Sequence, residues 1–459
     1  MGYSAVNYGI NDERPDKEPA SRDQLAIVPK ETLNNRPVAI DLFSGCGGMS
    51  LGLEAAGFDI AASVEIDPIH SIVHHYNFPY GVTVCQDIAR VKSRELLTAI
   101  ENKGFKSDVD VVAGGPPCQG YSHMGHRAID DPRNQLVFEY ARIVFEIRPK
   151  YFIFENVPGI LTGHHRKFLH ELVEKFEQNG YYIVQPIKIL DSADYGAPQR
   201  RKRLFLIGYR QDMTQPNYPN PTHGENLLPV NTVGSAISDL SQIAVHLKRD
   251  RGIDADCLDY SEFRNSFNLV PQGEYSLCHR RRADRIADSN YPHPNKTIWG
   301  HLGSKHTERT IERFASTLPG NKEPISHFFK LSPHGLSNTL RAGTASNKGA
   351  FTAPRPIHYA HPRCLSIREA SRLHTFPDWF QFHRTIWHGF REIGNAVVPL
   401  LAKAIGTEII NCLNVDKSSW EIRELDSIDD SILSFKMRRA SNFWQVPHNV
   451  IPQRNRTKV

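Results

Sequence analysis

The chain lacks several features that would assign it to whole classes of protein. No apolar run approaches the roughly 18 residues that span a bilayer, and the first residues are polar and charged rather than a signal-peptide core. The seven cysteines form no C-x-x-C pair, so neither a zinc ribbon nor a disulfide framework is indicated. We therefore expect a cytoplasmic protein, not bound to a membrane, whose thiols stay reduced.

The chain also lacks a strong charge of one sign. Its 459 residues contain 55 Lys and Arg against 50 Asp and Glu, a net charge of +5. This balance permits a polyanionic partner without requiring one. The length leaves room for two or three domains, and a content of 40% hydrophobic residues is ordinary for a globular protein.

The first ordered stretch lacks a completed dinucleotide-binding motif. Residues 38–43 predict a buried strand, 44–48 a glycine-rich turn and 49–57 a helix, which together open a nucleotide-binding α/β unit. The last glycine of G-x-G-x-x-G is missing because Ser50 occupies its position. A nicotinamide dehydrogenase is therefore disfavoured, and a cofactor without phosphate groups becomes more attractive.

Acidic residues follow the next two predicted strands. Glu65 ends the strand 60–64, about 20 residues beyond the turn, where such units place a carboxylate on ribose hydroxyls. Asp87 follows the strand candidate 81–85 and could contact an adenine amino group. Either acid alone could be a solvated strand-end residue. Together they favour an adenosine-containing ligand.

A stiff turn follows the fourth predicted strand, 109–113. Two prolines in the sequence GGPPCQGYS (114–122) fix φ and remove two backbone donors, so Cys118 is held rigidly. The end of a sheet strand is where an α/β protein places a reacting group, although a lone cysteine is usually a packing residue. Residues 123–134 are polar and predict a mobile loop able to fold over a substrate.

Strands and helices continue to alternate up to about residue 209. Helices are predicted at 136–147 and 165–179, and strands at 151–154, 182–190 and 204–208. Glu155 ends the strand that neighbours the cysteine strand, so its carboxylate can converge on the same pocket. The basic run 200–203 is placed to contact phosphate, although such runs are more often solvated surface.

The regular alternation of predicted strands and helices stops after about residue 210. The segment 276–314 contains eight Lys and Arg against four Asp and Glu, with Tyr291 and Trp299 interleaved. That composition suits a nucleic-acid surface, but a charged face without a partner would look similar. Helices are predicted again at 367–373 and 400–410. The polar tail after residue 414 is interpreted as a DNA-backbone-binding arm or a disordered segment.

Taken in order, these motifs resemble those of the DNA (cytosine-5)-methyltransferase family. The residues that carry the resemblance span 37–411 and are Asp41–Gly48, Glu65, Asp87, Gly114–Ser122, Glu155–Val157, Gln199-x-Arg201-x-Arg203, Arg368–Asp378 and Gly394–Val397. Each motif alone is weak, whereas seven or eight of them in one order are specific.

The resemblance implies an α/β fold in which a smaller target-recognition domain is inserted into a Rossmann-like AdoMet-dependent methyltransferase domain. The expected units are a loose N-terminal extension (1–36), the AdoMet-binding catalytic domain (37–209), the target-recognition domain (210–360), the return to the catalytic domain (361–413) and the C-terminal tail (414–459). It also implies that the segment around Asn395 packs back beside the first motif.

Site residues follow from the same resemblance. Cys118 would attack C6 of a flipped cytosine, Glu155 would bind its N3/N4 edge, and Arg201 and Arg203 would hold the base or its phosphate. S-adenosyl-L-methionine (AdoMet) would be bound by Phe43, Gly45, Gly47, Glu65, Asp87, Pro116 and Asn395. Gln119, Ser122, Arg133, Thr339 and Arg341 would contact DNA, and residues 121–133 would form the clamp. No metal is expected.

Partners and alternatives complete the hypothesis. We expect a monomer acting on double-stranded DNA, with a cognate restriction endonuclease that cuts the same site. One alternative is an RNA cytosine-5 methyltransferase, although those relatives resemble PPCQPF at the nucleophile and this chain has PPCQGY. The other is a catalytically silent DNA-binding relative, which the intact motifs disfavour.

Overall fold

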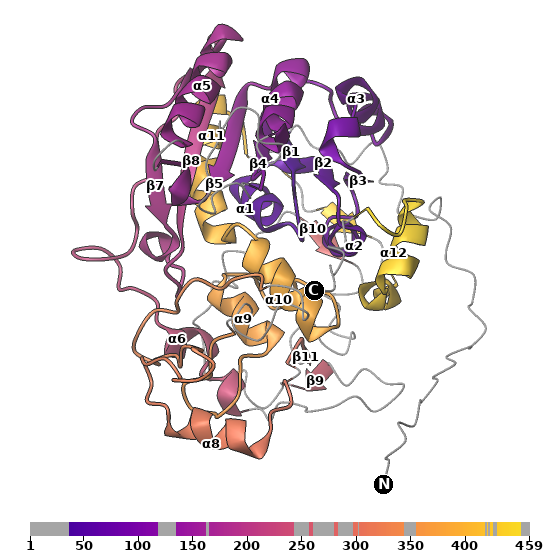
Figure 1. Ribbon diagram of the computed structural model, residues 1–459. Coiled ribbons are helices and arrows are strands. Elements are labelled where there is room, and N and C mark those ends of the chain that lie inside the picture. Colours follow the sequence, from indigo (N-terminus) through magenta and orange to yellow (C-terminus); the bar gives the residue numbers. More distant parts are fainter. Residues whose placement is uncertain are drawn as a thin grey trace, which may run out of the picture.

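The structure is a computed structural model. It describes residues 36–117, 135–161, 165–242, 257–259, 280–282, 297–301, 303–343, 355–417, 420, 423–425 and 429–450. A large α/β part carries the central sheet, and a smaller part made of short helices and loops lies at one end of it (Figure 1).

An eight-stranded sheet forms the centre of the α/β part, in the order β3-β2-β1-β4-β5-β8-β6, with β7 paired to β8. The strands are β1 (Val38–Leu42), β2 (Asp59–Glu65), β3 (Val82–Cys85), β4 (Val111–Gly114), β5 (Tyr151–Asn156), β6 (Tyr181–Ile183), β7 (Lys188–Asp191) and β8 (Lys202–Arg210). The first five strands are parallel and the last three are antiparallel to their neighbours. The sheet confirms the predicted Rossmann-like class.

The strand order places a topological switch point between β1 and β4. The chain runs outward from β1 to β3 and then returns to start β4 on the other side of β1. Crossovers on the two sides of that point diverge, which leaves room for ligands beyond the carboxyl ends of the strands. Both glycine-rich turns predicted from the sequence, after Leu42 and after Gly114, begin at this edge.

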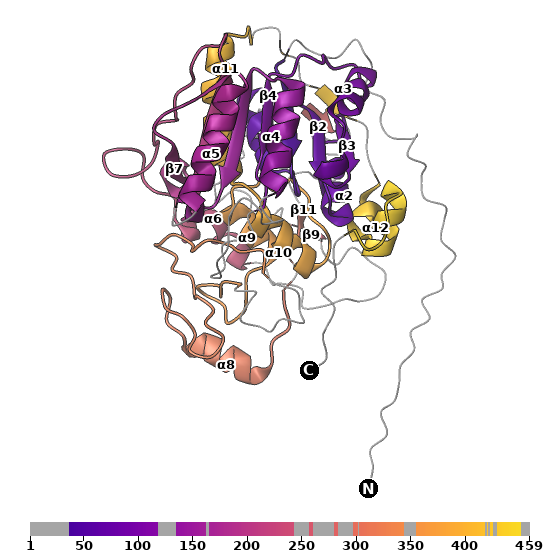
Figure 2. The ribbon, with the colours of Figure 1, turned by 45° about the horizontal axis from the view of Figure 1, so that its top comes forward.

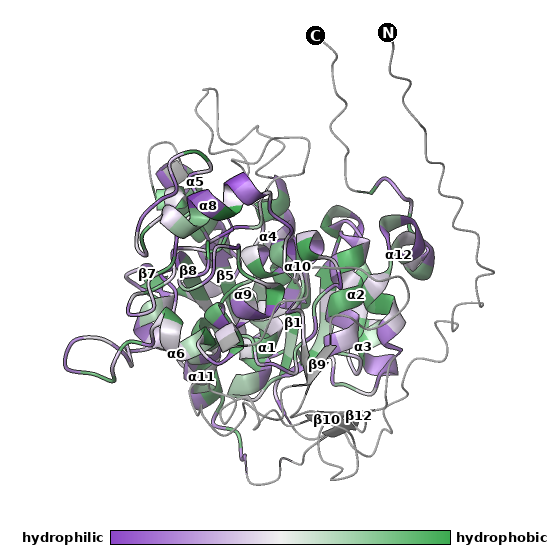
Figure 3. Ribbon diagram, turned by 90° about the horizontal axis from the view of Figure 1, so that it is seen from below, coloured by the Kyte–Doolittle hydropathy of each residue, from purple (hydrophilic) through white to green (hydrophobic). Residues whose placement is uncertain are grey.

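Helices cover both faces of the sheet, so its parallel strands are buried and read as continuous apolar runs. In Figure 2, α4 and α5 lie in front of the strands and α11 lies behind them. The helices of this part are α1 (Gly48–Ala56), α2 (Pro68–Asn77), α3 (Ser93–Asn102), α4 (Gln135–Ile147), α5 (His165–Gln178) and α11 (Pro399–Leu413). Figure 3 shows apolar colour along β1 and α1 and much polar colour on α3.

The chain returns to this part through α10 (Ile386–Asn395) and α11. A Cβ on Gly48 would lie 2.9 Å from the Ala396 Cβ, and one on Gly52 would lie 2.4 Å from the Ala402 Cβ. The segment after Asn395 therefore packs against the start of α1, as the family resemblance implies.

One helical stretch in the described part of the chain, Ile386–Leu413, is apolar and long enough to cross a membrane. Of its most apolar window, 61% is buried inside the protein, and residues 396–398 break it into α10 and α11. The stretch is therefore a pair of core helices.

Some predicted elements differ from the structure. The strand predicted at 182–190 is two strands, β6 and β7, because Pro186 lies between them and cannot donate to a ladder. Helices α2, α3 and α10 were not predicted. In α2 the hydrophobic pattern is hidden by His70, His74 and His75, all of which are buried.

The C-terminal segment 429–450 also differs from its prediction as an arm or disordered tail. It contains α12 (Met437–Trp444), which packs on α2 beside the sheet (Figure 1). The Trp444 indole donates to the Pro68 carbonyl at 3.1 Å, and the Tyr76 hydroxyl donates to Asp430. Apolar residues are about as frequent here as in the whole chain, and several of them, including Leu433 and Ala440, are buried.

The smaller part contains α6 (Val233–Ile237), α8 (Glu308–Ser316) and α9 (Ile367–Leu373), with short strands at β9 (Cys257–Asp259) and β11 (Thr297–Trp299). The strands β10 (Arg280–Arg282) and β12 (Arg423–Leu425) form a separate parallel pair. Much of the predicted nucleic-acid surface 276–314, including Tyr291, lies outside the described residues. The Trp299 ring lies 3.9 Å from the Arg384 guanidinium and is therefore engaged within the protein.

Candidate active site

A buried ion pair marks the carboxyl end of β5. Glu155 pairs across the ladder with Phe205 of β8, which places Arg203 on the neighbouring strand. The Arg203 Nε lies 2.8 Å from the Glu155 Oε1, and both side chains are largely buried. Burial raises the pKa of Glu155, while Arg203 and Arg201 act in the opposite direction. Burial thus favours protonation of the carboxyl group, while the ion pair with Arg203 holds it in place.

The turn after β4 lies directly against this ion pair. A Cβ on Gly115 would lie 2.7 Å from the Glu155 Oε2, so only glycine leaves room for the carboxylate. The Asn156 amide donates to the Pro116 carbonyl at 3.1 Å and fixes the chain that leads to residue 118. The structure therefore brings Glu155, Arg203 and the start of the predicted nucleophile turn together.

Several predicted site residues lie outside the described residues. They are Cys118, Gln119, Ser122 and Arg133, together with the whole clamp 121–133. Their roles stay predictions.

Arg201 is placed differently from its predicted contact with the base or its phosphate. Its guanidinium is 3% exposed and donates to the Leu340 carbonyl at 2.8 Å and to the Gly394 carbonyl at 2.9 Å. Burial, with the nearby Arg203, lowers the pKa of Arg201 to about 9. These acceptors come from segments that meet only in the folded protein, so no spacing in the sequence indicates them.

The turn after β1 has the geometry expected of a cofactor loop. Phe43 and Gly45 both have positive φ, at 59° and 54°. A Cβ on Gly45 would meet no atom within 4 Å, so this part of the turn faces open space. Gly47 has another role, because a Cβ there would lie 2.4 Å from the Phe78 ring.

Glu65 is joined to that turn. Its carboxylate accepts hydrogen bonds from the Gly45 amide at 2.9 Å and from the Asp67 amide at 2.8 Å. Each carboxylate oxygen has a second lone pair, so acceptor sites remain for hydroxyl groups. Glu65 and Gly45, both predicted to bind AdoMet, therefore lie together.

The other predicted cofactor residues lie near the same edge. Asp87 is two residues past β3, whose end pairs with Glu65, and its carboxylate accepts from the Ala89 amide. Pro116 is buried and follows β4, the strand beside β1. Asn395 is exposed at the end of α10, one residue before the contact with α1.

A polar network that the sequence did not reveal lies beneath the cofactor turn. The buried Asp41 carboxylate accepts from the Ser50 hydroxyl at 2.6 Å, and that hydroxyl also contacts His74 Nε2 at 2.9 Å. The Ser63 hydroxyl lies 3.1 Å from the other ring nitrogen of His74. Burial raises the pKa of Asp41 to about 7, although both Ser50 contacts lower it. The network ties β1, α1, α2 and β2 together.

The predicted DNA contacts Thr339 and Arg341 lie in the segment 337–341, which we call the recognition segment and which is attached at Arg200. The Arg200 amide donates to the Ser337 carbonyl at 2.9 Å, and the Thr339 hydroxyl donates to the Arg200 carbonyl at 2.8 Å. Arg341 is exposed. Thr339 is thus joined to Arg200, three residues before Arg203 in the chain.

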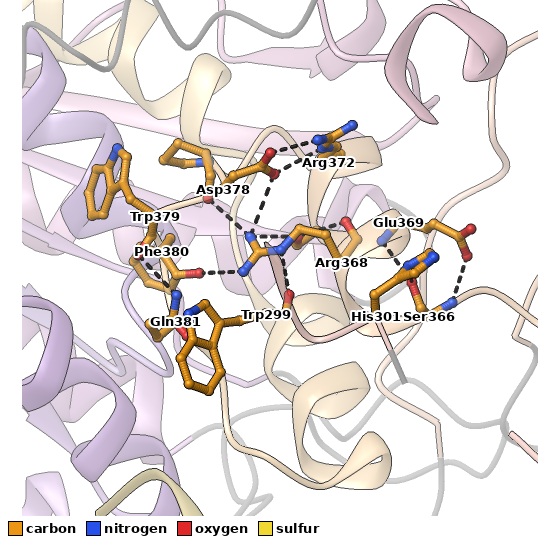
Figure 4. Close-up of polar contacts among 12 residues, drawn as sticks. Trp299, His301, Ser366, Arg368, Glu369, Arg372, Asp378, Trp379, Phe380 and Gln381 are labelled. Carbon is orange, nitrogen blue, oxygen red and sulfur yellow. Dashed lines mark hydrogen bonds and ion pairs between the residues drawn. The ribbon is translucent and has the colours of Figure 1, made fainter. Parts of the chain in front are cut away.

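Buried charges connect α9 to other segments of the smaller part. Arg368 is about as buried as any apolar core residue and donates to the carbonyls of Trp299, Pro377 and Phe380 (Figure 4). Arg372 pairs with Asp239 at 2.7 Å and with Asp378 at 2.6 Å. The predicted motif at Arg368–Asp378 therefore has a structural role and ties α9 to the segments around Asp239 and Trp299.

Three functional candidates were missed from the sequence: Asn156, Gln199 and His374. Asn156 stands beside the predicted Glu155, and Gln199 begins the predicted basic motif, so both had a sequence indication. His374 had none. Among the described residues, no group of three or more His, Cys, Asp and Glu side chains could hold a metal ion.

Comparisons with known proteins agree with this geometry. The family model described as C-5 cytosine-specific DNA methylase matches residues 38–411. The chain is 44% identical to Type II methyltransferase M.XorII of Xanthomonas oryzae, over 92% of this chain and 95% of that protein. It is 33% identical to Type II methyltransferase M1.HphI of Haemophilus parahaemolyticus, over 81% and 86%.

A solved structure is also similar. It is of an E. coli protein described as a DNA modification methyltransferase encoded within a prophage. The two chains share 32% sequence identity and a TM-score of 0.64, over 83% of this chain and 100% of that one.

Proposed function

The chain belongs to the C-5 cytosine-specific DNA methylase family, and from this premise we propose that it transfers a methyl group from AdoMet to C5 of a cytosine in a specific double-stranded DNA sequence. The observation that carries the proposal is the buried Glu155–Arg203 pair packed against Gly115. A carboxyl group, a cation and the turn that carries a cysteine thereby meet at one end of the sheet.

Cys118 is the proposed nucleophile. Cytosine C5 is a poor nucleophile until a group adds to C6, and a thiolate is both strongly nucleophilic and a good leaving group. Formation of the S–C6 bond moves the π electrons of the 5,6 double bond toward C5. After methyl transfer, loss of the C5 proton and breakage of the S–C6 bond return the enzyme to its initial state.

Glu155 is proposed to hold the N3/N4 edge of the base. Because burial raises its pKa, the carboxyl group can carry a proton and share it with N3 as negative charge develops on the ring. Arg203 orients that carboxyl group through the 2.8 Å ion pair. A stacked cytosine cannot reach these groups, so the base must be flipped out of the duplex.

The cofactor turn suits AdoMet. The open space above Gly45 and the free lone pairs of Glu65 fit an adenosine ribose. AdoMet has no phosphate, which agrees with the missing third glycine of the dinucleotide motif. When bound, it supplies a methyl group on a sulfonium leaving group. Phe43, Asp87, Pro116 and Asn395 are proposed to complete the site.

The names of the relatives support a Type II restriction–modification role. We propose that methylation protects DNA from a cognate endonuclease acting on the same sequence, that the enzyme acts in the cytoplasm, and that residues 210–360 form the target-recognition domain. Gln119, Ser122, Arg133, Thr339 and Arg341 are the proposed DNA contacts.

Bisulfite sequencing of DNA from cells that express the protein tests the reaction and identifies the site. We expect one short sequence in which a cytosine is protected from conversion, and no protection with Cys118→Ser. A complete absence of protected cytosines with the unaltered protein would contradict the proposed function.

A trapping experiment tests the nucleophile separately. A duplex with 5-fluorocytosine at the methylated position should form a covalent adduct, because fluorine cannot leave as the C5 proton does. An adduct that persists in Cys118→Ala would show that another residue attacks C6.

A further inference from the structure

The recognition segment and the cofactor segment are held together by one buried cluster, which we call the junction: Gln199, Arg201 and His374. All three side chains are almost completely buried. In Figure 1 the helices next to the cluster, α9 and α10, lie between the sheet and the smaller part. None of the three was assigned a positioning role from the sequence.

The first connection runs through Arg201. Its Nη1 donates to the Leu340 carbonyl and its Nη2 to the Gly394 carbonyl. Leu340 lies between the proposed DNA contacts Thr339 and Arg341, whereas Gly394 precedes the proposed cofactor residue Asn395. One rigid, planar guanidinium thus spans both segments, and a single ammonium group could not reproduce that fork.

The second connection runs through Gln199 and His374. The Gln199 Oε1 accepts from the Leu340 amide at 2.8 Å, which fixes the orientation of the side-chain amide. Its Nε2 must then donate, and His374 Nδ1 lies 3.1 Å away. His374 Nε2 lies 3.0 Å from the Ala396 carbonyl. These partners require a neutral imidazole with its proton on Nε2.

Direct contact reinforces both connections. A Cβ on Gly394 would lie 2.1 Å from the Ala342 amide nitrogen and 2.3 Å from the Arg341 carbonyl carbon. Backbone therefore packs on backbone between the recognition segment and the end of α10. Three residues after Gly394, the Val397 carbonyl oxygen would lie 2.3 Å from a Cβ on Gly48, at the base of the cofactor turn.

Both backbone groups of Leu340 are held by the junction, so the recognition segment cannot shift without moving the end of α10. We propose that Gln199, Arg201 and His374 are positioning residues that make DNA binding and cofactor binding mutually reinforcing. This inference rests on the proposed function. DNA bound at the recognition segment, or cofactor bound beside Asn395, favours one arrangement of the junction. The second ligand then binds more tightly because that arrangement is already formed.

The test measures the affinity for S-adenosylhomocysteine, which cannot react, by calorimetry with and without a duplex that contains the site found by bisulfite sequencing. We expect the duplex to tighten binding by about 5- to 150-fold in the unaltered protein. In Arg201→Lys the tightening should fall to about twofold or less, while the affinity without DNA changes little. By thermodynamic linkage, S-adenosylhomocysteine must tighten DNA binding by the same factor.

Arg210→Lys is the matched control, because it makes the same exchange at the other end of β8, where Arg210 pairs with Asp212. It should keep the full tightening. If Arg201→Lys does not fold, Gly394→Ala tests the same link by adding a methyl group against Ala342, and alanine favours the helix. Equal tightening in the junction variant and the control, or none in the unaltered protein, would overturn the inference. If the protein methylates no cytosine, that result contradicts the proposed function and not this inference.

Discussion

The central sheet and the joint segment (residues 355–396) are both buried, but different side chains stabilise them. The strands β1, β4 and β5 bury apolar residues such as Ile40, Val112 and Ile153. The joint segment also buries apolar residues such as Phe376 and Phe380, but it adds buried arginines and acids, including Arg372 and Glu392. The sheet is held largely by non-directional burial, whereas the joint segment adds directional contacts between charged side chains.

The difference explains what each region does. Apolar burial tolerates small changes of shape, so the sheet can keep its register while loops at its edge vary. A buried ion pair fixes the relative direction of two segments and leaves a costly charge when one partner is lost. The charged contacts therefore fix how segments of the smaller part are oriented relative to one another.

Of the changes that test this difference, removal of Arg372 should lower the free energy of unfolding most. Arg372→Met keeps much of the volume but leaves Asp239 and Asp378 without their main cation, since Arg368 approaches Asp378 only to 3.8 Å. We expect a loss of about 3–5 kcal/mol in the free energy of unfolding. Urea denaturation of the purified protein measures it.

Lys92→Met is the control for that experiment. Lys92 pairs with Glu95 at 2.7 Å but is well exposed, and surface pairs contribute little. Its denaturation midpoint should not move measurably. A comparable loss in both variants would show that charge removal, rather than burial of the pair, causes the effect.

The sequence predicted the sheet far better than the joint. Strands β1, β2, β4 and β5 were placed within two residues because each is an apolar run next to a glycine or acidic residue. Glu155 and Arg203 could be assigned to one site from their motifs, and the structure joins them at 2.8 Å. Local pattern suffices where the stabilising residues are apolar and close in the chain.

The contacts of the joint segment and of the junction could not be predicted, because they connect segments that are far apart in the chain. Gln199 and His374 are 175 residues apart, and Arg201 and Gly394 are 193 apart. Helix α10 was missed since Glu392, although fully buried, reads as a solvated residue. A buried polar residue carries no periodic pattern that identifies its partner.

Glu392 gives a prediction of intermediate size. Burial raises its pKa to about 8, partly offset by the His383 amide, which donates to Oε2 at 3.0 Å. The pKa of Glu392 is higher in the folded protein than in the unfolded one. Its contribution to the free energy of unfolding is therefore complete below about pH 4.5 and is lost as the pH rises through about 8. Glu392→Gln removes this titration, and we expect the variant to gain about 2 kcal/mol relative to the unaltered protein between pH 6 and 8.

Unfolding free energies of both proteins at several pH values measure this gain. Asp41, whose pKa is about 7, titrates over a similar range but is present in both proteins, so it cancels in the difference. A difference that is constant with pH would show that Glu392 ionises normally in the folded protein.

A change within the sheet should have the smallest effect. Ile153 is fully buried on β5, two residues before Glu155, and pairs with Ala113 and Ile207. Ile153→Val removes one methylene and should cost about 1 kcal/mol in unfolding free energy. Because ladder hydrogen bonds on both sides fix the strand, Glu155 should stay in place and the methylation rate should stay near that of the unaltered protein. A large fall in rate without a matching loss of stability would mean that the site depends on close packing of the sheet, and the tolerance argued for the apolar region would not hold.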